Sequence, residues 1–102
     1  MSGQFYATHD DPYGEVAVFS SQEQRDDWVN YKDPFSLLYP GNYDGKRIAI
    51  TQAQAEKIAG NRLYNKEFYM EDFEFGNYFW VESDRPVPDA MDMINAIFLN
   101  EL

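Results

Sequence analysis

The chain has 102 residues, no cysteine and a formal net charge of −10 at neutral pH, from 18 acidic and 8 basic side chains. This length corresponds to one domain, and a chain without cysteine has no disulfide, no thiolate metal site and no cysteine nucleophile. The negative charge should repel nucleic-acid phosphates and anionic membranes and attract basic proteins. We therefore expect one acidic domain, residues 1–102, that binds neither nucleic acid nor membrane directly.

The first segments of the chain predict a β-hairpin. Apolar side chains alternate between two faces over residues 4–8, with Phe5 and Tyr6 on opposite faces. Residues 15–19 contain a short apolar run rich in β-branched side chains, which favours a buried strand. The segment between them, residues 9–14, is dense in turn formers, so the two strands should pair.

A helix over residues 21–31 is predicted next. Ser20 and Glu23 have the spacing of a capping box, in which the serine hydroxyl accepts a hydrogen bond from the amide three residues later. Trp28 falls near the end of this helix, where its ring can pack beneath the sheet. Burial of that ring would contribute roughly 2–3 kcal/mol. The predicted fold is organised around this strand and helix.

The middle of the chain predicts a connector followed by a second strand and helix. Three turn signals lie within residues 32–46, which we interpret as a loop between the first helix and the next strand, either a packed connector or a functional or mobile segment. Residues 47–50 predict a strand, and Thr51 then repeats the capping pattern before an alanine-rich helix over residues 52–59. Gly60 should end that helix in a left-handed conformation.

Residues 62–83 are rich in aromatic side chains, and two interpretations fit them. A turn at Gly76 favours a hairpin between strands over residues 66–75 and 78–82. Aromatic residues between positions 64 and 75 also match a helical stripe that ends at the same glycine. We favour the hairpin.

The last segment predicts a helix from about Pro88 to Asn100. Proline suits the first helical turn because its missing N–H would have no partner there. Apolar side chains then recur at helical spacing, at Met91, Ile94, Ile97 and Phe98. The elements together predict a single α+β domain, with an antiparallel sheet of about four or five strands and two or three helices packed mostly on one face.

One turn holds the strongest candidate for a metal or catalytic site. His9, the single histidine, is followed by Asp10 and Asp11. Adjacent residues in a turn rarely converge on one ion, so we expect no metal and no cofactor. The sequence has neither a phosphate-binding loop nor a nucleophile elbow. We expect a non-enzymatic protein, with a small enzyme or metal binder built on this turn as the alternative.

Negative charge is concentrated in residues 61–102, which hold nine acids and three bases, net −6. Carboxylates two residues apart on an extended chain lie about 7 Å apart, a spacing comparable to that of phosphates along a nucleic acid. Such a face suits the basic groove of a nucleic-acid-binding protein. A homodimer through the aromatic residues 64–81 is a further alternative. The predicted contacts with a basic partner protein are Glu67, Glu71, Asp72 and Glu74.

The N-terminal half carries a pattern that extends over about residues 5–60. It resembles small uncharacterised acidic bacterial proteins, many of them associated with phages and mobile elements. These have a strand, a Phe-Ser-x-x-Glu-x-Arg-Asp-x-Trp-Val helix, a second strand and a short alanine-rich helix. The resemblance implies no established activity and no site residues, and it favours an inhibitor of a host nucleic-acid-binding protein. Residues 1–7 do not have the pattern of a signal peptide, so we expect a cytoplasmic protein. The matching residues are Phe19, Ser20, Glu23, Arg25, Asp26, Trp28 and Val29.

Overall fold

A computed structural model describes residues 4–9, 14–30, 47–72 and 76–99. These residues form one antiparallel sheet of five strands and four helices, which confirms the predicted α+β class. The strands are β1 (Phe5–His9), β2 (Glu15–Phe19), β3 (Arg47–Ile50), β4 (Tyr69–Glu71) and β5 (Tyr78–Glu82). The helices are α1 (Gln22–Asn30), α3 (Gln52–Ala59), α4 (Asn61–Tyr64) and α5 (Val87–Phe98).

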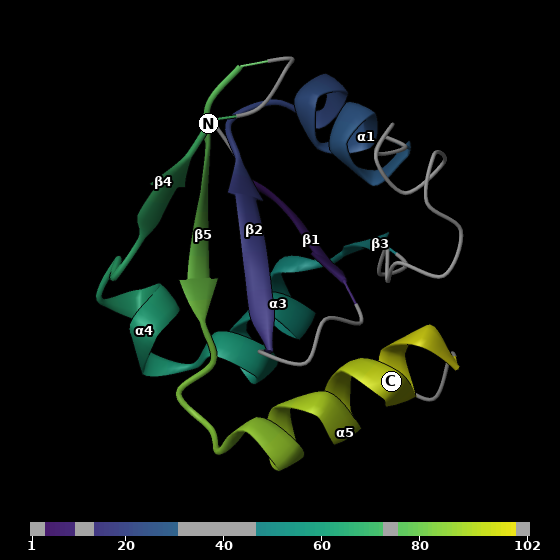
Figure 1. The fold of residues 1–102 in the computed structure, drawn as a ribbon, viewed down its shortest axis with the longest axis vertical. Helices are drawn as coiled ribbons and strands as arrows, with labels where there is room; N and C mark the ends of the chain where they lie inside the picture. The colour runs from purple at the N-terminus through teal and green to yellow at the C-terminus, as the bar shows by residue number, and fades with distance from the viewer. Residues whose placement is uncertain (1–3, 10–13, 31–46, 73–75, 100–102) are drawn as a thin grey trace, which may run out of the picture.

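The strands follow the order β3-β1-β2-β5-β4 across the sheet (Figure 1). β1 and β2 pair antiparallel, with Tyr6 opposite Val18, so the predicted hairpin is confirmed. β3 pairs with the other side of β1, and β5 pairs with the other side of β2, with Ala17 opposite Trp80. The C-terminal hairpin of β4 and β5 is thereby attached to the N-terminal hairpin.

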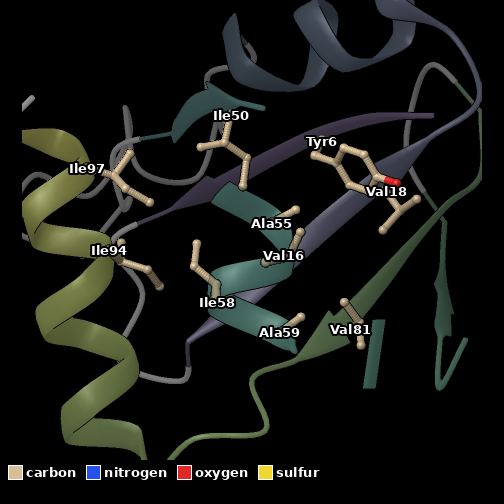
Figure 2. Packing of buried hydrophobic residues seen from close by; sticks show 10 residues of the cluster. All are labelled: Tyr6, Val16, Val18, Ile50, Ala55, Ile58, Ala59, Val81, Ile94 and Ile97. Atoms are coloured by element: carbon tan, nitrogen blue, oxygen red, sulfur yellow. The ribbon is translucent and has the colours of Figure 1, made fainter. Parts of the chain in front are cut away.

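One face of the sheet is covered by α3 and α5, and Leu63 of α4 packs against the same cluster. Figure 2 shows Ile94 and Ile97 pointing from α5 toward α3 and the sheet. The prediction that the helices lie mostly on one face is therefore confirmed. Within the described residues, no helix is both long and apolar enough to cross a membrane. The buried members of this cluster are Tyr6, Val16, Val18, Ile50, Ala55, Ile58, Ala59, Val81, Ile94 and Ile97.

Helix α1 lies on the opposite face and anchors there through Trp28. The indole is only 3 % exposed and packs with Ala7, Ala17 and Phe19. Its ring centroid lies 5.7 Å from that of Phe19. Because β-strand side chains alternate between faces, Phe19 points to this layer while Val18 points to the other. The predicted burial of the tryptophan beneath the sheet is confirmed.

The two helix starts that the sequence predicted differ in outcome. At α3, the Thr51 hydroxyl accepts from the Gln54 amide at 3.1 Å and the Gln54 side chain accepts from the Thr51 amide, which confirms the capping box. At α1, the predicted cap at Ser20 is wrong by one residue: the Ser21 hydroxyl accepts from the Gln24 amide at 3.1 Å. β2 ends at Phe19, as predicted, and α1 begins at Gln22, so two residues rather than one separate the strand from the helix.

The aromatic segment confirms the hairpin, in a shorter form than predicted. β4 pairs antiparallel with β5, with Tyr69 opposite Trp80. Residues before β4 form the short helix α4 and then a tight turn, in which Lys66 has a positive φ of 56° and the Phe68 amide donates to the Lys66 carbonyl. The alternative helical stripe over residues 64–75 is wrong, because α4 ends at Tyr64. The predicted connector 32–46 and residues 73–75 lie outside the described residues.

Candidate functional site

Helix α1 covers only part of its face of the sheet, since it contacts mainly β1, β2 and β3. Beside it, the same face bears alternate side chains of β5 and β4, because Glu71 is paired with Tyr78 and Tyr69 with Trp80. A recess of about 240 Å³ lies there, open to solvent. We call it the aromatic recess. Its lining residues are His9, Glu15, Ala17, Trp28, Glu71, Tyr78 and Trp80.

Four of the seven residues that line the aromatic recess carry rings: His9, Trp28, Tyr78 and Trp80. The rings of Tyr69 and Trp80 stack with centroids 4.6 Å apart and planes inclined by 25°. Tyr78 contacts both Phe19 and Trp28, with centroid distances of 5.1 and 5.9 Å. The faces of such rings carry negative electrostatic potential, which attracts cations.

Charged groups around the recess act on Tyr78. Burial raises the pKa of this phenol, the Trp28 indole lowers it by hydrogen bonding, and Glu71 and Glu15 raise it further by their negative charge. Arg47 opposes them: its guanidinium lies 4.3 Å from the centre of a Trp28 ring and donates a 2.8 Å hydrogen bond to the Trp28 carbonyl. The protein thus already holds one guanidinium against the tryptophan that lines the recess.

Replacing Glu71 with glutamine should lower the pKa of Tyr78, because it removes a negative charge that raises it. The matched control is Glu56→Gln, which should lower the pKa of Tyr6 instead. The folded state favours the neutral Tyr78 phenol. This preference contributes fully to the free energy of unfolding below about pH 10, and the contribution is lost as the pH rises through the pKa of Tyr78 in the folded protein. Titration of each tyrosine ring by NMR measures both shifts. Equal shifts of Tyr78 in the two variants would contradict the placement of Glu71 in the recess.

Three of the four acidic residues predicted to bind a partner lie on β4 or close to its ends. Glu71 lies on β4 and lines the recess, and Asp72 follows it directly. Glu67 lies before the start of β4 and directly after the turn at Lys66. Its carboxylate oxygen Oε2 lies 3.5 Å from Nδ2 of the Asn65 side chain. Both Glu67 and Asp72 are exposed. Glu74 lies outside the described residues.

The alternative site around the single histidine is only partly described. His9 lines the aromatic recess and meets Trp28 edge-on, with ring centroids 5.7 Å apart. Asp10 and Asp11 lie outside the described residues. Within the described part of the chain, no group of three or more His, Asp or Glu side chains is arranged to hold a metal ion.

Sequence reasoning missed the aromatic walls of the site, in particular Trp80 and Tyr69. The signal was present in the alternation of residues 78–82, which places Tyr78 and Trp80 on one face, but the pairing of β5 with β2, which brings Tyr78 beside Trp28, was not evident. The recess is smaller than the roughly 300–1,000 Å³ typical of small-molecule sites, so it suits a single side chain. Its aromatic and carboxylate groups match a lysine or arginine.

Comparison of the chain with protein-family models, with curated proteins and with solved structures finds no match.

Proposed function

We propose that the protein is a non-enzymatic binding protein whose aromatic recess receives a cationic side chain of a basic partner protein. The observation that carries the proposal is the Glu71 carboxylate beside the stacked rings of Tyr69 and Trp80 on the open part of the sheet face. Aromatic faces attract a cation, and a carboxylate adds a charge-assisted hydrogen bond that a guanidinium can accommodate in its plane.

The charges near β4 support the same proposal. Neither Glu71 nor Asp72 forms an ion pair with another described residue, so both can interact with a partner. Glu82, in contrast, lies 3.4 Å from Arg62. The net charge of −10 would steer a basic protein toward the molecule and accelerate the encounter, while the recess supplies the specific contact.

We further propose that the basic partner is a nucleic-acid-binding protein and that its inhibition serves a phage or mobile element. The resemblance over residues 5–60 supports this role, and the acidic C-terminal part of the chain supports occupation of a basic groove. We place the interaction in the cytoplasm, which agrees with a chain that has no cysteine.

Substituting Glu71 with glutamine should weaken binding of a short arginine-rich peptide about tenfold at low salt, because a charge-assisted hydrogen bond is lost. Asp92→Asn is the matched control: it removes the same charge from an exposed position on α5. That control should change the dissociation constant less than about twofold at physiological salt, since exposed charges more than a Debye length from a contact are largely screened there. Calorimetric titration at two salt concentrations measures both variants.

Two results would count against this function. Equal weakening by Glu71→Gln and Asp92→Asn would show that only net charge attracts the peptide and that the recess contributes nothing. Failure of the unmodified protein to bind any arginine-rich peptide at low salt would remove the proposal altogether.

A further inference from the structure

We infer that the partner presents its cationic side chain on an extended segment, which adds as a further strand to the outer edge of β4. This inference rests on the proposed function and specifies the kind of partner that the site recognises. Strand addition requires a strand edge that no other described strand occupies, with side chains on both faces that match the incoming segment. It also requires that a second copy of the chain does not pair with that edge.

β4 is the terminal strand of the sheet. It pairs with β5 on one side, and no other described strand pairs with its opposite side. Figure 1 shows β4 along the outer margin of the sheet, beyond β5. All three residues of β4 are exposed. A strand edge of this kind offers backbone amide and carbonyl groups to an incoming extended peptide.

The two faces of this edge have different chemistry. Tyr69 and Glu71 point to the face of the aromatic recess, while Met70 lies on the other face, opposite Phe79. Met70 is 63 % exposed, and Phe79, which also contacts the ring of Phe68, is 45 % exposed. An added strand would therefore place alternate residues against carboxylate and aromatic rings, and the residues between them against an apolar surface. The matching segment alternates basic and apolar side chains.

Charge selects among the strands that could pair here. A second copy of the chain would place another Glu71 at the interface and add a further net charge of −10 to the complex, and like charges on neighbouring strands are unfavourable. The same carboxylate attracts a strand that carries arginine or lysine. Negative charge at this edge thus protects the sheet from self-association and leaves it open to a cationic partner.

Two synthetic peptides of equal composition test the inference. In one, arginine and valine alternate; in the other, the arginines and valines are grouped in two blocks. We expect the alternating peptide to bind about tenfold more tightly, because only alternation places every arginine on the face of Glu71 and every valine on the apolar face, and each matched cross-strand pair contributes roughly 1.5- to 5-fold in affinity. Its binding should shift the NMR amide signals of Tyr69, Met70 and Glu71.

Backbone methylation of the alternating peptide separates strand addition from attraction between side chains. Alternate amides of a strand point to the same neighbour, so methylation of one alternate set should remove the strand-specific gain in affinity. Methylation of the other set should leave that gain unchanged. A peptide held only by its charges would respond equally to both modifications.

The outcomes distinguish this inference from the proposed function. If both peptides bind equally and both methylated forms behave alike, strand addition is overturned while binding of a cationic side chain stands. If no peptide binds, the proposed function fails as well. If light scattering shows a dimer that Met70→Lys dissociates, a second copy occupies the edge and the inference is wrong.

Discussion

Replacing Trp28 with alanine should lower the free energy of unfolding by about 3–5 kcal/mol, the usual cost of deleting a large buried ring. The indole is 3 % exposed and touches the rings of Phe19, Tyr78 and His9, while Arg47 lies over it. A domain of this size has a total stability of roughly 5–15 kcal/mol. The variant should therefore be close to unfolding, which urea denaturation followed by circular dichroism would measure.

Tyr64→Ala is the matched control for this prediction. It also deletes a large ring from a helix, but Tyr64 is 83 % exposed, so the stability should change by less than about 0.5 kcal/mol. Trp28→Phe keeps part of the buried surface and should fall between the two. A loss below about 1 kcal/mol for Trp28→Ala would show that α1 is not held to the sheet by this side chain.

Gly14→Ala should destabilise the protein by about 2–5 kcal/mol, from two causes that act together. Gly14 has a φ of +70°, a conformation that costs a residue with a Cβ atom about 1–2 kcal/mol. A Cβ at this position would also lie 2.7 Å from the Cβ of Ala90 on α5, and such overpacking costs about 1–3 kcal/mol. Thermal or urea unfolding of the variant measures the sum.

A double-mutant cycle separates the two causes. Ala90→Gly removes the atom that Gly14→Ala would meet, so the double variant should recover about 1–3 kcal/mol relative to the sum of the single changes. The backbone cost at position 14 should remain. If the free-energy changes of the two single variants simply add in the double variant, Gly14 and Ala90 of α5 do not approach each other as closely as in the structure.

The local elements of the fold followed from the sequence by itself. Alternation of apolar residues indicated β1 and assigned Phe5 and Tyr6 to opposite faces, and a short apolar run rich in β-branched side chains indicated β2. A cap such as Thr51 with Gln54 depends on residues three positions apart. The start of α1 was displaced by one residue because Ser20 and Ser21 are adjacent and either hydroxyl can cap a helix, so the local pattern did not distinguish them.

Only the tertiary structure decided where the candidate site lies. Alternation assigns Tyr78 and Trp80 to one face but does not say that β5 pairs with β2 or that Tyr69 of β4 stacks on Trp80. Local pattern likewise did not indicate the turn at Lys66, after which β4 begins only at Tyr69, so Glu67 lies outside the strand that was predicted to contain it. Among the described residues, α1, held by Trp28, covers this face of the sheet over β1, β2 and β3 and leaves the part beside β5 uncovered. Such coverage depends on packing between segments distant in the sequence, which no local pattern encodes.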